Sequence, residues 1–363
     1  MLANDQNDTT LKLLNDIVLP FLEDGTVIPV ISNSFRIEQI FQGDLELREL
    51  LKKEAKYYDD ASTLEQQLTK LWATKINYPM SDDRNLARVA QYRQVEKQDT
   101  EIPKIEYLKL INERLLKLAE NDSDFKDKVA ELRARTQRLV FSETAQQLEY
   151  PRGFSPERQD PLELLASLDL PIFITTSYSN FLEAKLEKLG KPARTQLCFW
   201  DGNKAGINPD HLPDPKFNPT PQNPAVYHLF GLEQHRETIV LSEDDYMNFL
   251  ISATEGFNST ELFPSPLRLA LPSARLILIG YNLRDWDFRA LFRFLLMARK
   301  TAKKKKSIAI QLKPVLGNKD YERGSETYLK QFFDDYDFTV VWNNPDEFIY
   351  NLMDAKKAGK SQS

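Results

Sequence analysis

Cysteine and histidine are scarce in this chain of 363 residues. Cys198 is the single cysteine, which excludes an internal disulfide framework and a four-cysteine zinc site. The three histidines are His211, His228 and His235, and their spacing does not match a zinc-binding pattern. We therefore expect no metal site.

Long apolar runs are also missing. No stretch reaches the roughly 18 uncharged apolar residues that a membrane-spanning helix needs, and the first ten residues, MLANDQNDTT, carry no basic or apolar signal segment. We expect a cytoplasmic protein that does not contact membranes. The formal net charge of −6 argues against a nucleic-acid-binding surface, because such surfaces cluster lysine and arginine. We interpret the basic run at 299–306 as a solvated loop, with an acidic partner or nucleic acid as the alternative.

The chain has the composition of a globular protein, with 41% hydrophobic and 28% charged residues. Short apolar segments rich in β-branched residues predict strands, and they alternate with helical patterns. Because parallel neighbours need crossover connections, this alternation predicts an α/β, Rossmann-like, doubly wound and mostly parallel sheet. The predicted strands are 26–31, 171–176, 226–231, 275–279, 307–312 and 338–342.

A long helical pattern separates the first two predicted strands. It is rich in Leu, Lys, Glu and Gln. We expect residues 1–37 to form the first helix and strand of the core, 38–150 a helical insertion, and 151–363 the rest of the core. Farther along, Ser242 with Asp245 three residues later resembles a capping arrangement and predicts a helix N-terminus.

Four predicted strands end in polar residues, at 32–34, 175–178, 228–231 and 280–287. In a parallel sheet these ends share one edge, where ligands bind. A turn after the first strand can present backbone N–H groups to a pyrophosphate. We interpret Asp285 and Asp287 as helix caps. The candidate binding residues are Ser32, Asn33, Ser34, Thr175, Thr176, Gly231, Gly280, Tyr281 and Asn282.

The order of these tips resembles that of the sirtuin-like domains of prokaryotic anti-phage defence proteins. The resemblance rests on ITTSYSNFLEAKLEKLG, VYHLFGLEQHRETIVLSEDDYMNFL and LILIGYNLRDWDFRALFRFLL, with VVWNNPDEFIYNL as a weaker match. It covers almost the whole chain and implies a pocket for NAD or an ADP-ribose-like nucleotide. It also implies a homo-oligomer and a defence-system partner such as an ATPase.

The sequence departs from this family in three motifs. The family has a Gly-Ala-Gly type turn, a Thr-Thr-Asn-Tyr-Asp type segment and a histidine directly before a glycine. Here Ser32-Asn33-Ser34 replaces the turn, Ser177 replaces the asparagine and Phe230 replaces the histidine. Loss of a general base typically lowers the rate by about 10²–10⁴-fold, so the departures predict little or no glycosidic hydrolysis.

Two functions from different classes follow. The first is a catalytically degenerate sensor or assembly subunit of a bacterial defence system. The second is an active NAD glycohydrolase that depletes NAD during infection, with His228, Ser177 and Asn180 as catalytic groups. His228 lies in an apolar segment and is also interpreted as a buried packing residue. A third alternative is a scaffold whose pocket has closed around Phe230.

Overall fold

The structure is a computed structural model of the chain. It describes residues 12–54, 63–135, 140–152, 154, 158–200, 206–214, 216–256, 264–283, 285–299, 305–312 and 319–360.

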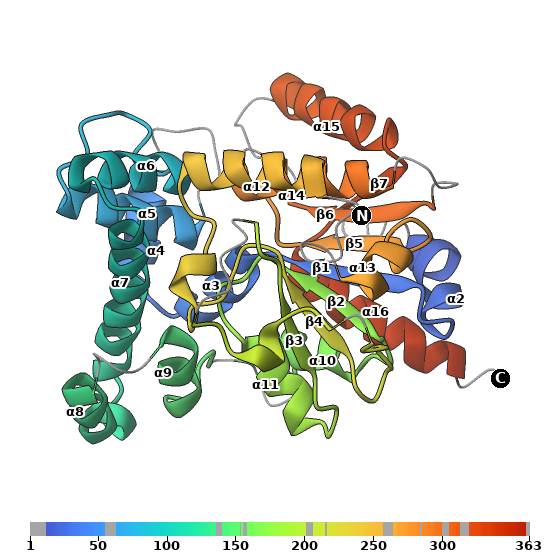
Figure 1. Cartoon of the computed structure of the whole chain (residues 1–363), viewed down its shortest axis with the longest axis horizontal. Coiled ribbons are helices and arrows are strands. Elements are labelled where there is room, and N and C mark those ends of the chain that lie inside the picture. The colour runs from blue at the N-terminus through green and yellow to red at the C-terminus, as the bar shows by residue number, and fades with distance from the viewer. Residues whose placement is uncertain are drawn as a thin grey trace.

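A single seven-stranded sheet forms the centre of the described structure (Figure 1). The strand order is β3-β4-β2-β1-β5-β6-β7, and every neighbouring pair is parallel. This arrangement confirms the predicted α/β, Rossmann-like sheet. The strands are β1 (Val27–Ile31), β2 (Ile172–Thr175), β3 (Arg194–Leu197), β4 (Ala225–His228), β5 (Arg275–Ile279), β6 (Ser307–Gln311) and β7 (Phe338–Trp342).

In the described part of the chain, α-helices lie between all consecutive strands except β3 and β4. The described α-helices are α2 (Leu19–Leu22), α3 (Asn33–Phe41), α4 (Leu45–Glu54), α5 (Leu64–Lys75), α6 (Leu86–Lys97), α7 (Glu101–Glu120), α8 (Lys126–Arg135), α9 (Phe141–Gln147), α10 (Pro161–Ser167), α11 (Phe181–Lys188), α12 (Glu243–Gly256), α13 (Ser265–Ala270), α14 (Trp286–Ala298), α15 (Lys319–Asp334) and α16 (Pro345–Lys360). A π-helical turn over Leu14–Val18 precedes α2, and 3-10 turns lie at Ser123–Phe125, Pro209–His211 and Arg236–Thr238. The predicted reciprocal cap at the start of α12 is confirmed, because Asp245 N–H donates to Ser242 Oγ and Ser242 N–H donates to Asp245 Oδ2.

Helices α4 to α9 form a helical region between β1 and β2 in the chain. Figure 1 shows this region as the blue to green helices at the left, beyond one end of the sheet. α7 is its longest helix and packs against α5, α6, α8 and α9. The region therefore lies over the sheet edge where the polar tips were predicted.

Strand β1 is central and its five residues are all buried. It contains Pro29, which lacks a backbone N–H and is unfavourable inside a sheet. The register of β1 with β2 begins one residue later, at Val30 opposite Ile174, while β1 pairs with β5 along its whole length. The proline therefore lies outside the β1–β2 ladder.

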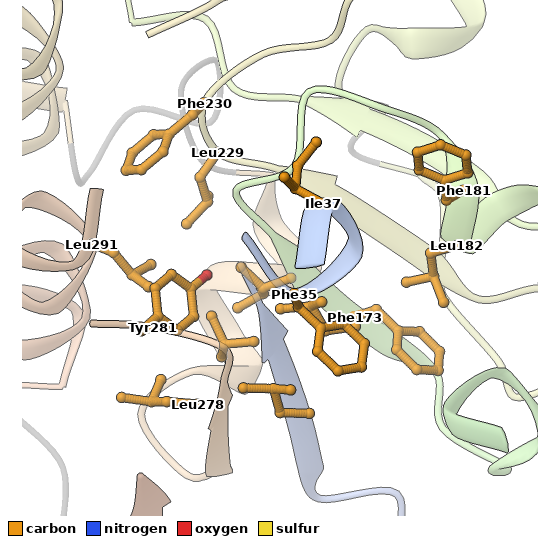
Figure 2. Close-up of a cluster of buried hydrophobic side chains, with 14 of the residues drawn as sticks. Phe35, Ile37, Phe173, Phe181, Leu182, Leu229, Phe230, Leu278, Tyr281 and Leu291 are labelled. Carbon is orange, nitrogen blue, oxygen red and sulfur yellow. The ribbon is translucent and has the colours of Figure 1, made fainter. Parts of the chain in front are cut away.

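Buried aromatic and aliphatic side chains pack between the sheet and its helices. Figure 2 shows Phe35 from α3 near Phe173 from β2, and Leu278 and Tyr281 from β5 and its tip. Phe230 is fully buried and contacts Tyr246 and Phe249 edge-on, with ring centroids 5.3 and 5.1 Å apart. Phe230 is thus part of the core between β4 and α12.

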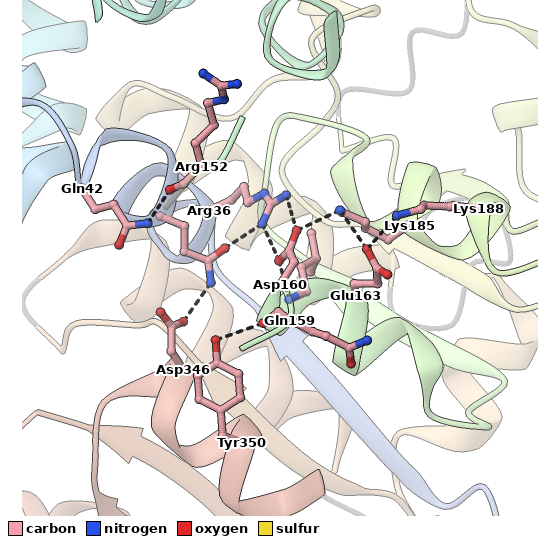
Figure 3. Close-up of polar contacts among 12 residues, drawn as sticks. Arg36, Gln42, Arg152, Gln159, Asp160, Glu163, Lys185, Lys188, Asp346 and Tyr350 are labelled. Carbon is pink, nitrogen blue, oxygen red and sulfur yellow. Dashed lines mark hydrogen bonds and ion pairs between the residues drawn. The ribbon is translucent and has the colours of Figure 1, made fainter. Parts of the chain in front are cut away.

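A buried ion pair joins α3 to the start of α10 (Figure 3). Arg36 donates from its two terminal nitrogens to the two carboxylate oxygens of Asp160, at 2.8 and 2.9 Å. Burial alone would raise the pKa of Asp160, but Arg36 and Lys185 outweigh it and lower the pKa. Asp160 also accepts the Leu162 N–H at 2.9 Å and so caps α10. These contacts hold α3 in a single orientation.

Gly280 permits close packing of two strand ends. Its φ is +79°, and a Cβ there would stand 2.5 Å from Ser32 Oγ and 2.8 Å from the Phe35 Cβ. The space beside Gly280 is therefore filled by the β1–α3 turn. Ser32 Oγ in this turn also donates a hydrogen bond to the Gly280 carbonyl oxygen at 2.7 Å.

We predict that Gly280→Ala lowers the free energy of unfolding by roughly 2–4 kcal/mol, because it adds both left-handed backbone strain and overpacking. Urea denaturation measures this change. Gly43→Ala is the matched control, since no atom lies within 4 Å of its Cβ position. Equal stability of the two variants would contradict the packing role of Gly280.

Candidate functional site

A small cavity lies at the carboxyl ends of β1, β2 and β5. Its volume is about 40 Å³, whereas ligand pockets usually measure about 300–1,000 Å³. Strand tips and the helical region both contribute to its wall. The lining residues are Asn33, Glu65, Gln66, Thr69, Arg84, Asn85, Leu86, Ala87, Thr176, Tyr178, Tyr246, Asp285, Trp286 and Asp287.

Asn33 and Glu65 form the polar contact at the end of β1. Asn33 is the first residue of α3, and its Nδ2 donates to Glu65 Oε1 at 2.7 Å. Ser34 Oγ donates to the other carboxylate oxygen of Glu65, and Tyr107 OH lies 3.5 Å from Oε1. Glu65 is the second residue of α5, so a carboxylate of the helical region lies against the start of α3.

Three carboxyl groups gather around this contact, and burial opposes the ionisation of each. Burial raises the pKa of Glu38 to about 8, and this carboxyl accepts the Glu65 N–H at 3.2 Å. Burial also raises the pKa of Glu65, although hydrogen bonds from Ser34 and Asn33 oppose the shift. Burial, with the charges of Asp285 and Glu65, raises the pKa of Asp287 well above its usual range. The cavity wall is thus acidic and poorly solvated.

The tip of β2 is organised by its threonines. Thr175 Oγ1 donates to the Ile31 carbonyl at 3.0 Å and accepts the Ser177 N–H at 2.9 Å. Thr176 Oγ1 lies 3.1 Å from Tyr281 OH, which links this tip to that of β5. Thr176 lines the cavity, whereas Thr175 makes its side-chain hydrogen bonds to the backbone of neighbouring segments.

His228, the last residue of β4, is fully buried. Its Nδ1 lies 3.0 Å from the Ser177 carbonyl and its Nε2 lies 2.7 Å from Glu183 Oε1. Burial opposes protonation of His228, but Glu183 outweighs it and raises the pKa of the imidazole. Burial likewise opposes ionisation of Glu183, and His228 outweighs it and lowers the pKa of that carboxyl. The two side chains form a buried ion pair.

The other two candidate catalytic residues lie after β2. Ser177 Oγ donates to Asn33 Oδ1 at 3.5 Å and accepts the Ser179 N–H at 3.2 Å. Asn180 precedes α11, and its Oδ1 is buried without a hydrogen-bond partner in the described part of the chain. Among these two and His228, none is part of the cavity wall.

The predicted binding residues divide into those at the cavity and those that make contacts within the fold. Asn33 and Thr176 line the cavity, and Ser34 contacts it through Glu65. Ser32 caps α3, Gly280 packs on Ser32, and Tyr281 bonds to Thr176. Gly231 has a φ of +84° and packs against the backbone of Thr238 and Ile239. Asn282 is partly exposed in the β5–α14 turn.

Asp285 and Asp287 line the cavity although the sequence indicated helix caps. Asp285 has the extended backbone of an N-cap residue but makes no side-chain capping bond. It accepts from Gln66 Nε2 at 3.3 Å instead. Asp287 accepts the N–H of the next residue, Phe288, at 2.5 Å.

The contribution of the helical region was missed by sequence reasoning. The sequence Thr63-Leu64-Glu65-Gln66 carries a capping box, which the structure contains at the start of α5. That signal locates a helix N-terminus but not its neighbour in space. Only the packing of α5 on α3 places Glu65 at the cavity.

A second and larger cavity lies between the helical region and α12. Its volume is about 690 Å³, and Lys104, Trp200, Glu101, Glu237 and Asp244 are among its lining residues. The Lys104 ammonium lies 3.3 Å from Glu101 and 5.9 Å from the centroid of the Trp200 ring.

In the described ranges no cluster of three or more His, Cys, Asp or Glu residues is arranged to hold a metal ion. No helix among the described residues has both the length and the apolar character to cross a membrane.

The sequence profile of the SIR2-like domain family matches residues 171–339. The chain therefore contains a SIR2-like domain that runs from β2 into the first two residues of β7, and this family suggests NAD binding. β1, α3 and the helical region, with Asn33 and Glu65, lie outside the matched segment. No curated protein sequence matches the chain.

We predict that His228→Gln lowers the free energy of unfolding by about 3–5 kcal/mol, because it leaves Glu183 buried without its cationic partner. The pKa of His228 is raised in the folded state, so its stabilising contribution is present below about pH 6.5 and is lost as the pH rises through the raised value. Urea denaturation from pH 6 to pH 9, with the half-buried His211→Gln as control, measures both effects. A pH-independent difference between wild type and His228→Gln would contradict the ion pair.

Proposed function

We propose that the chain binds NAD or an ADP-ribose-like nucleotide at the strand-end cavity without efficient cleavage, as a sensor or assembly subunit of a bacterial anti-phage defence system. The SIR2-like domain at 171–339 supports the nucleotide. The position of the cavity at the carboxyl ends of parallel strands supports the site, since α/β folds bind ligands there. A defence partner such as an ATPase and self-assembly rest on the sequence resemblance alone.

The hydrogen-bonding contacts of His228 are the main observation that argues against catalysis. A general base needs a nitrogen that can reach the substrate proton. Both ring nitrogens of His228 lie within hydrogen-bonding distance of protein groups, and its side chain is fully buried. Phe230, where the family has its histidine, packs in the core against Tyr246 and Phe249. These contacts support a binding site over a hydrolytic one.

The NAD glycohydrolase is the second candidate, and one contact favours it. The Asn33 carboxamide lies 3.5 Å from Ser177 Oγ, so a carboxamide stands beside the serine that replaces the family's asparagine. In this alternative Asn33 takes over the positioning of a ribose hydroxyl or water.

The volume of about 40 Å³ bears on the scaffold alternative. A nucleotide does not fit such a space, so binding requires the cavity to open. A scaffold has no such need. Direct measurement of ligand binding separates the two.

We predict that ADP-ribose at 100 times its dissociation constant stabilises the protein by about 2.7 kcal/mol and that incubation with NAD releases no nicotinamide. Thermal unfolding with ADP-ribose and a fluorescent NAD analogue measure the two results. Nicotinamide release that His228→Ala abolishes, in a variant that thermal unfolding shows to be folded, would establish the glycohydrolase. Absence of any thermal shift would favour the scaffold.

We predict that Thr176→Val weakens ADP-ribose binding about 5–10-fold, because one hydrogen bond contributes about 1 kcal/mol. Thr176 lines the cavity, whereas the control Thr144→Val removes a hydroxyl that donates to the Val140 carbonyl inside α9. Isothermal titration calorimetry compares the two variants. Equal affinities would place the ligand away from the β2 tip.

A further inference from the structure

The start of α3 lies in the wall of the proposed site. α3 follows β1 directly, its N-cap is Ser32, and it is nine residues long. Helix N-termini at this place in Rossmann-like folds receive the ligand pyrophosphate, since N–H groups and the helix dipole favour negative charge. In this structure a carboxylate of the protein itself lies there.

The Glu65 carboxyl group accepts hydrogen bonds from side-chain donors at the start of α3. Its two oxygens accept from Asn33 Nδ2 and from Ser34 Oγ, which are on the first two residues of α3. Tyr107 OH adds a third contact from α7, at 3.5 Å. All three groups are neutral donors that any oxyanion can use.

This arrangement is electrostatically unfavourable for Glu65. In the described structure no lysine or arginine forms an ion pair with it, and Glu38 and Asp287 are among the groups that face it. A buried carboxylate without a cation is costly unless hydrogen bonds compensate. Glu65 therefore depends on the hydrogen bonds from Asn33, Ser34 and Tyr107.

Glu65 also belongs to a wall that closes the cavity. Gln66 and Thr69 of α5 line the same space of about 40 Å³, and Gln66 bonds to Asp285 at the β5 tip. The first turn of α5 is thus part of the wall that separates the strand tips from open space.

We propose that Glu65 is an internal substitute for the ligand phosphate, which holds the nucleotide site closed until the ligand displaces it together with the first turn of α5. This inference rests on the proposed nucleotide site and adds its regulation. Because α5 packs on α4, α6 and α7, occupancy of the site is thereby coupled to the position of the helical region. A partner that contacts this region would sense the bound nucleotide.

We predict that Glu65→Gln and Glu65→Ala bind ADP-ribose at least tenfold more tightly than wild type, because both remove the competing carboxylate. Adenosine, which has no phosphate, gains less affinity from these substitutions than ADP-ribose does, because it gains only the easier opening of the cavity and not the vacated anion position. Isothermal titration calorimetry measures both ligands. Glu113→Gln is the matched control, since Glu113 is a partly exposed carboxylate on α7 that pairs with Lys75 and Lys109. Glu65→Gln keeps the shape of the side chain, and its thermal unfolding confirms that it folds.

Hydrogen exchange on the wild-type protein gives an independent readout. ADP-ribose is expected to accelerate exchange of the α5 amides near Glu65. Equal affinity of wild type and both Glu65 variants, or slower exchange in α5, would overturn the inference and leave the nucleotide site standing. Failure of all the proteins to bind ADP-ribose would overturn the nucleotide site and, with it, the inference.

Discussion

The parallel pairing of β1 on both of its edges is the constraint on which the site depends. β1 runs beside β2 and β5, so all three strands end at the same edge of the sheet. Their tips bring Asn33, Thr176 and Asp287 to one cavity although they are far apart in the chain. Gly280 lets the β5 end approach Ser32 closely, and Arg36 holds α3 to Asp160. The strand ends are thus rigidly placed.

The acidic residues at this edge of the sheet oppose the binding of an anionic nucleotide. The start of α3 favours an anion, yet the helical region supplies Glu65, and Glu38 and Asp287 stand nearby with raised pKa values. The donors that hold Glu65 are neutral, so an oxyanion of a ligand can use the same groups. On the opposite side of the β2 tip, His228 is bound to Glu183 inside the protein. The contact of Glu65 with α3 and the pairing of His228 with Glu183 are therefore two separate features at the carboxyl ends of the strands.

Much of the architecture was predictable from sequence. The apolar runs located six strands, and the pair Ser242 and Asp245 located the start of α12. β3 was missed because Arg194-Thr195-Gln196-Leu197 is a polar, partly exposed edge strand without an apolar run. Within the site, Asn33 and Thr176 were predicted, and Tyr178 and Tyr246 were not selected as lining residues. Polar residues at the end of a strand indicate that a ligand can bind there, but they do not indicate which side chains face the cavity.

The sequence by itself determined the alternation of strands and helices, the parallel sheet, and the residues Ser32-Asn33-Ser34, Ser177 and Phe230 at the strand ends. These follow from periodicity and from residue identity, which are local properties. Only the tertiary structure decided that Glu65 lies on α3, that His228 pairs with Glu183, and that Gly280 packs on Ser32. Each of these contacts joins separate elements, 32, 45 and 248 residues apart, and depends on how those elements pack together.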